Sequence, residues 1–67
     1  MFAVIVSRYS PQRGKYVVSE VFRHLSQYPR AVALADAERQ DCDRLFPADQ
    51  IQVDVISEVT GEVMVEL

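Results

Sequence analysis

This 67-residue chain has little of the chemistry that most enzymes use. It contains one cysteine, Cys42, and one histidine, His24. A single cysteine excludes an internal disulfide and a zinc site built from several cysteines, and it suits a reducing compartment. A catalytic thiol must be accessible and activated by a neighbouring base, and no feature of the sequence pairs these two residues. We therefore expect a cytoplasmic protein that is not an enzyme.

Glycine, long apolar runs and repeats are also scarce. The two glycines, Gly14 and Gly61, are too few for a glycine-rich phosphate-binding loop. The longest apolar run, residues 1–6, has no basic leader and is too short to span a bilayer, so it is better interpreted as a strand than as a signal peptide. No linker or low-complexity tract divides the chain. We expect one domain over residues 1–67, with no cofactor and no membrane contact.

The composition that remains is that of a small folded domain, with 49% hydrophobic and 25% charged residues. A chain of this length buries only about 60% of its unfolded surface, so its stability margin is small. Association with a second copy would add to that margin. The sequence therefore favours a protein that binds a protein partner or itself.

The clearest pattern covers residues 51–67, where apolar and polar residues alternate on both sides of Val59-Thr60-Gly61. Such alternation is typical of two half-buried strands. A three-residue loop that ends in glycine suits a type I turn followed by a left-handed residue. A one-residue slip would put half of the valines in water, so the pattern rejects it. The predicted cross-strand pairs are Glu58 with Glu62, Ile56 with Met64, Val55 with Val65, and Asp54 with Glu66.

On the outer face of this hairpin, an apolar pair would lie between two pairs of acids. Opposed like charges are unfavourable, so we expect this surface to face something basic, or water and salt. Four regularly spaced carboxylates also leave open the imitation of a phosphate backbone, although four are few for that role. The predicted protein interface consists of Ile56, Met64, Asp54, Glu58, Glu62 and Glu66.

The first half of the chain predicts two more strands. Residues 2–6 (FAVIV) are apolar at every position, which is typical of a central strand buried on both faces. Residues 10–14 supply proline and glycine for a turn, and residues 15–22 form the next strand. His24 then lies at a strand end or in a loop. The predicted alternation in the second strand places Tyr16, Val18 and Phe22 on one side and Val17, Ser19 and Val21 on the other.

The alanine-rich segment 31–44 predicts one amphipathic helix. Pro29 is tolerable in its first turn, and the helix starts at Ser26 or Tyr28. It ends before Phe46-Pro47, because the residue before proline is pushed out of the helical conformation. The stripe that faces the sheet consists of Ala31, Leu34, Ala35, Glu38, Cys42 and Leu45, which makes the thiol a buried and unreactive group.

The predicted fold is therefore α+β with the order ββαββ. The second and third strands are joined through the helix and run in the same direction, and the first strand fits between them, antiparallel to both. This gives a four-stranded antiparallel sheet in the order 2-1-3-4 with one helix on one face. The opposite face stays open, and an uncovered face with apolar side chains is a candidate interface.

Charge is divided unevenly along the chain. Residues 1–30 hold five basic side chains and one acid, a net +4, and residues 31–67 hold two basic side chains and nine acids, a net −7, which together give −3. The two halves either neutralise each other across a shared sheet or form a two-signed surface that selects a partner or drives self-association. The acids of residues 36–43 spread around a helix and match no calcium loop, so we expect no metal site.

Nucleic-acid binding is the alternative interpretation. A basic turn with aromatic side chains can contact phosphates and stack bases, although a domain of net charge −3 lacks an overall basic footprint. The candidate contacts are Arg8, Arg13, Lys15, Tyr9 and Tyr16. Our leading expectation is a non-enzymatic protein-binding or regulatory module that acts as a homodimer through its open sheet face or an edge strand.

Overall fold

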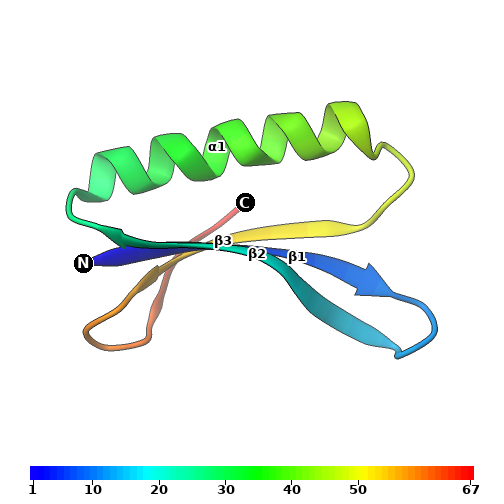
Figure 1. The fold of residues 1–67 in the computed structure, drawn as a ribbon, viewed down its shortest axis with the longest axis horizontal. Coiled ribbons are helices and arrows are strands. Elements are labelled where there is room, and N and C mark those ends of the chain that lie inside the picture. Colours follow the sequence, from blue (N-terminus) through cyan, green and yellow to red (C-terminus); the bar gives the residue numbers. More distant parts are fainter.

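The computed structural model describes all of residues 1–67, and its elements follow in the order ββαββ. They are β1 (Phe2–Ser10), β2 (Lys15–Leu25), α1 (Tyr28–Leu45), β3 (Ile51–Ser57) and β4 (Val63–Glu66). The sheet order is β2-β1-β3-β4, every neighbouring pair is antiparallel, and α1 lies across one face (Figure 1). The predicted fold, strand order and one-sided helix are confirmed.

β1 occupies the centre of the sheet because both of its faces are apolar. Val4 and Val6 point to the helix side and are almost fully buried, while Ala3 on the other side is also buried. On the helix side, β1 pairs through these valines with Val53 and Val55 of β3. The core beneath the helix consists of Val4, Val6, Ala31, Ala35, Ile51, Val53 and Val55.

The helix begins at Tyr28 and ends at Leu45, with the amide of Phe46 donating to the carbonyl of Cys42 (2.8 Å). Its first turn contains Pro29, which costs no hydrogen bond there. α1 does not combine the length and the apolar character that crossing a membrane requires. The predicted stripe holds except at Leu45, which is 57% exposed at the end of the helix where β1 and β2 bend away from it (Figure 1).

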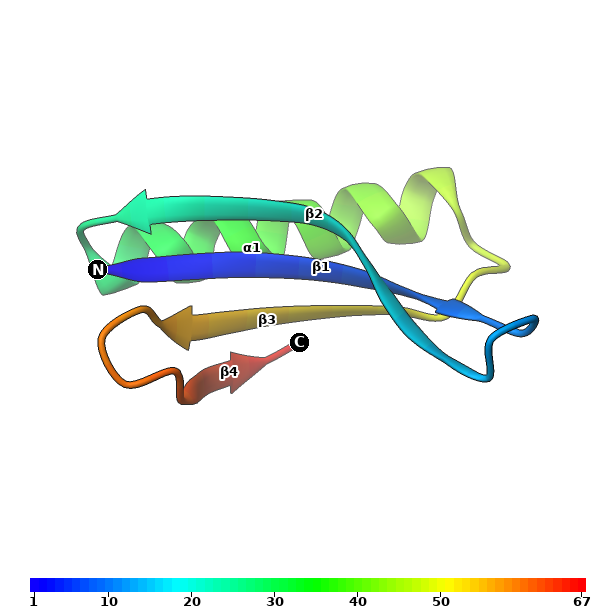
Figure 2. The same ribbon diagram turned by 60° about the horizontal axis from the view of Figure 1, so that its bottom comes forward.

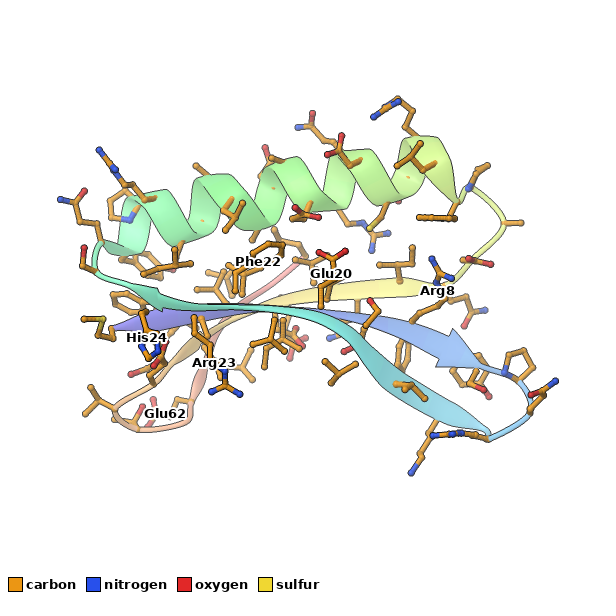
Figure 3. The ribbon with its side chains drawn as sticks, in the orientation of Figure 1. Arg8, Glu20, Phe22, Arg23, His24 and Glu62 are labelled. Carbon is orange, nitrogen blue, oxygen red and sulfur yellow. The ribbon has the colours of Figure 1, made fainter.

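The pairing of β2 with β1 shifts register at two points. Each shift is a bulge that adds a residue to β2 and so reverses which side chains face the helix. Phe22 therefore packs beneath the helix against the core (Figure 3), whereas Tyr16 and Val18 belong to the other face. The prediction that these three side chains share one side is wrong, because it assumed an unbroken period of two. The second bulge includes His24, whose φ of 63° is left-handed.

The closing hairpin keeps part of its predicted register. Asp54 lies opposite Glu66 and Val55 lies opposite Val65, as expected. The register then shifts, and Ile56 pairs with Val63 rather than with Met64.

The turn of this hairpin is longer than predicted and covers residues 58–62. The amide of Gly61 donates to the carbonyl of Ser57 (2.7 Å), and the amide of Ser57 donates to the carbonyl of Glu62 (2.9 Å). Gly61 adopts the expected left-handed conformation with φ 76°. The predicted pairing of Glu58 with Glu62 is wrong, and the longer turn keeps these two acids from facing each other across the ladder.

Candidate functional site: the open face of the sheet

No element covers the face of the sheet opposite α1 (Figures 1 and 2). Side chains from three strands meet there, because Ile5 lies opposite Val21 of β2 and Ala3 lies opposite Ile56 of β3. With Val18 they line a hollow of about 480 Å³. We refer to Ala3, Ile5, Val18, Val21 and Ile56 as the open-face patch. Val18 is 55% exposed and Val21 is 39% exposed, so the patch presents apolar surface to solvent.

One basic residue, Arg23, borders the patch at the β2 side. It projects from the side of the sheet away from the helix (Figure 3). The chain has four ion pairs, and none of them includes this guanidinium. Arg23 is therefore a free positive charge beside an apolar surface.

Three acids lie on the opposite side of the patch, on β3, β4 and the turn between them. Asp54 and Glu66 face each other across the ladder, and Glu62 is exposed in the turn. The side-chain amide of Gln52 donates to Asp54 (3.1 Å), but none of the three acids has a basic partner. We refer to Asp54, Glu62 and Glu66 as the acidic corner, and its opposed carboxylates repel one another within the isolated chain.

Glu58 has a different role from the one predicted for it. Its carboxylate accepts a hydrogen bond from the backbone amide of His24 (2.6 Å), and the imidazole Nδ1 lies 3.5 Å from its other oxygen. Its own amide donates to the carbonyl of Met1 (3.0 Å). Glu58 therefore links the β3–β4 turn to the start of β1 and to the end of β2. Its carboxylate binds the backbone amide of His24, the residue with the left-handed conformation in the bulge.

The predicted interface residues thus separate into three groups. Ile56 joins the open-face patch, and Asp54, Glu62 and Glu66 form the acidic corner, whereas Glu58 is engaged locally. Met64 is 46% exposed and lies at the register shift of β4 instead of opposite Ile56. Sequence reasoning anticipated apolar residues on this face but did not single out Arg23, since its position depends on the bulge before it.

The open face has the shape of a saddle. The β1–β2 turn and the β3–β4 turn bend away from the helix at opposite corners, while the other two corners rise toward the ends of α1 (Figure 1). This shape follows from the right-handed twist of the strands.

Both free edges of the sheet are poorly suited to pairing with another strand. β2 carries two bulges, and β4 is short and runs beside only the last part of β3 (Figure 2). Bulges and short edge strands are features that keep sheets from joining edge to edge. The open face is therefore the better candidate contact surface.

The side chains of the basic first turn are divided between the two faces of the sheet. Arg8 lies on the helix side, where its Nε is 3.4 Å from Asp49 and its guanidinium stacks 4.3 Å from the centre of the Phe46 ring. Tyr9 and Tyr16 form an edge-to-face pair, with centroids 5.4 Å apart, on the opposite side. The structure brings the tyrosines together, and it places Arg8, Tyr9 and Arg13 along one groove beside the turn.

Arg13 and Lys15 stay exposed at the tip of the same hairpin and take part in no ion pair. A groove of about 740 Å³ runs beside the tip and is lined by Arg8 and Arg13. Asp49 also lines this groove, so a carboxylate offsets part of its positive charge.

A smaller cavity of about 190 Å³ lies between α1 and the sheet, where Cys42 and Glu38 face Glu20 of β2. Burial, and then the charges of Glu38 and Glu20, raise the pKa of the Cys42 thiol, with Arg8 and Arg39 acting in the opposite direction. A thiol with a raised pKa carries less thiolate, which makes it a poorer nucleophile at neutral pH. No group of three or more histidine, cysteine, aspartate or glutamate side chains could hold a metal ion.

Glu38 gives a pH-dependent prediction. Burial, then Glu20, then Asp41 raise the pKa of its carboxyl above 4.5. The ionised form is thus disfavoured in the folded state, and stability is lost as pH rises through the raised pKa. Glu38→Gln should increase the free energy of unfolding at neutral pH by roughly 0.5 kcal/mol, and this gain should vanish below about pH 4.

Urea unfolding at neutral and acidic pH measures this difference. Asp36→Asn is the matched control, because Asp36 is an exposed acid on the same helix. An equal gain for Glu38→Gln at both pH values would contradict the assignment of the effect to ionisation.

The fold and this face define a small ββαββ domain with an uncovered, charge-bordered sheet surface. No family model, curated protein or solved structure matches this chain. Its function is therefore inferred from the surface itself.

Proposed function

We propose that this protein is a non-enzymatic protein-binding module whose contact surface is the open face of the sheet. The observation that carries the proposal is the open-face patch, an apolar hollow bordered by unpaired charges of both signs. Apolar surface grouped in this way, with a polar border, is characteristic of protein interfaces. A flat array of charge alone would interact mainly with water.

The thin core gives a second reason for a partner on this face. Only nine of the 67 residues are buried, and the accessible surface is 4640 Å², compared with roughly 4300 Å² for a compact monomer of this mass. Covering the exposed parts of Val18 and Val21 would contribute roughly 1 kcal/mol each. Binding would therefore stabilise the fold as well as bring two proteins together.

Nucleic-acid binding through the first turn draws less support from the same geometry. Arg8 is engaged by Asp49 and Phe46, and Asp49 also lines the groove that Arg8 shares with Tyr9 and Arg13, so it offsets part of the positive charge there. Catalysis draws no support from the raised pKa of Cys42. Protein binding is the function that the open-face patch and the unpaired charges beside it support best.

Site-specific photo-crosslinking tests the proposal. A photoreactive residue at Val18, in the open-face patch, should yield a covalent adduct with one defined protein in cells that express this chain. The same residue at Ala37, which is exposed on the outer side of α1, is the matched control and should yield none. Identical adducts from both positions, or no adduct from position 18 in a folded protein, would overturn the proposal.

A further inference from the structure

We infer that the occupant of the open face is a second copy of this chain, packed face to face about a two-fold axis parallel to the strands. The inference rests on the proposed function and names the partner of the same surface. It follows from the shape of the face, from the strand order and from the placement of the unpaired charges.

The shape of the face is complementary to itself. A sheet that is curved only by its twist has the shape of a saddle. Rotation of that saddle by 180° about the strand direction gives a surface with the same twist. Two such sheets therefore follow each other's curvature wherever they overlap, as in aligned β-sandwiches. The bent corners at the β1–β2 and β3–β4 turns (Figure 1) give this protein that saddle.

The strand order then determines which elements meet. A two-fold axis along the strands, between β1 and β3, reverses the order β2-β1-β3-β4 across the interface. β1 of one copy lies over β3 of the other, and β2 lies over β4. The β1 and β3 members of the two open-face patches cover each other, because Ala3 and Ile5 of β1 then lie over the β3 strand that carries Ile56. Val21 of β2 is level with Glu66 of β4 in the sheet, so it lies over Glu66 of the other copy.

The same rotation brings opposite charges together. The rotation leaves the two ends of the strands where they are, but it exchanges the β2 edge and the β4 edge of the sheet. Arg23 lies on β2 at the end of the sheet that carries the β3–β4 turn, as does Glu62 (Figure 3). Each Arg23 therefore lies over Glu62 of the other copy and within reach of Glu66, and the symmetry forms this contact twice.

The dimensions of the face indicate how strong the contact is. The molecule measures 34 Å along its longest axis and 15 Å along its shortest, and the helix and sheet layers stack along neither of these (Figure 1). The projected face of about 500 Å² lies below the roughly 600–1000 Å² per partner of stable specific interfaces, in the range of weak and transient contacts. We expect a dimer that dissociates on dilution into the low micromolar range.

Charge reversal tests this geometry by sedimentation of the full chain. Arg23→Glu alone should weaken dimerisation about tenfold or more, and Glu62→Lys with Glu66→Lys should do the same, because each variant places like charges together twice. An equimolar mixture of the two should form a heterodimer in which both contacts are attractive. A chain that carries all three changes should recover the homodimer and thereby show that the changed residues are compatible with folding.

The outcomes separate this inference from the proposed function. A wild-type chain that is monomeric at high micromolar concentration would overturn the self-association, and charge-reversed variants that fail to associate on mixing would overturn the proposed two-fold arrangement. If the photoreactive residue at Val18 then captured a different protein, the binding module would stand with another partner. If the chain were monomeric and captured nothing, both would fall.

Discussion

Replacing Val53 by aspartate should unfold this protein, whereas the same replacement at Val59 should leave it folded. Val53 is fully buried in β3, opposite Val6 and beneath the helix, and Val59 is 82% exposed in the β3–β4 turn. A carboxylate at position 53 would have no hydrogen-bond donor or basic partner among the apolar side chains around it. An uncompensated buried charge costs about 4 kcal/mol or more.

That cost is comparable to the whole stability of the domain. A chain of this length has a free energy of unfolding of roughly 3–10 kcal/mol, and its core beneath the helix contains only seven buried residues. Circular dichroism and urea unfolding of the two variants measure the difference. If Val53→Asp unfolded at the same urea concentration as Val59→Asp, position 53 would lie outside the core and the register of β3 would be shifted.

The second large effect is expected at the contact between the helix and the sheet. Ala35 is fully buried where α1 lies on the sheet, and its methyl group sets how closely the two layers approach. Ala35→Leu should destabilise the protein by about 1–3 kcal/mol, because the larger side chain forces the helix away or into strained rotamers. Ala37→Leu, on the exposed side of the same helix, should change stability by less than about 0.5 kcal/mol.

Because both substitutions replace alanine by leucine, the difference between them removes helix propensity from the comparison. Urea unfolding gives both free energies. Equal stabilities would mean that the helix does not pack closely on the sheet at Ala35.

The closing hairpin shows how much of a strand register the alternation of apolar and polar residues can predict. Alternating valines placed Val55 opposite Val65 correctly, since a one-residue slip would have exposed them. The same reasoning failed at Ile56, because hydrogen bonds from Ser57 and Gly61 close a longer turn. Turn length depends on which backbone groups find partners, including the amide of Glu58 that pairs with Met1 far away in the sequence.

The open-face patch was also predictable from the sequence only in part. Its apolar character was readable in residues 2–6, because a strand that is apolar at every position must place side chains on both faces. Which residues of β2 belong to the patch could not be predicted, because the bulges of that strand reverse the alternation. Nothing in a pattern of alternating residues marks where an extra residue is inserted.

By itself, the sequence determined the order of elements, the strand order with the apolar strand in the middle, and the existence of an uncovered face. These follow from periodicity, helix propensity and chain connectivity, all of which are properties of neighbouring residues. Only the tertiary structure decided that Arg8 is neutralised by Asp49 while Arg23 stays free beside the patch. The reason is physical, because an ion pair depends on the distance between groups that the fold brings together and the sequence keeps far apart.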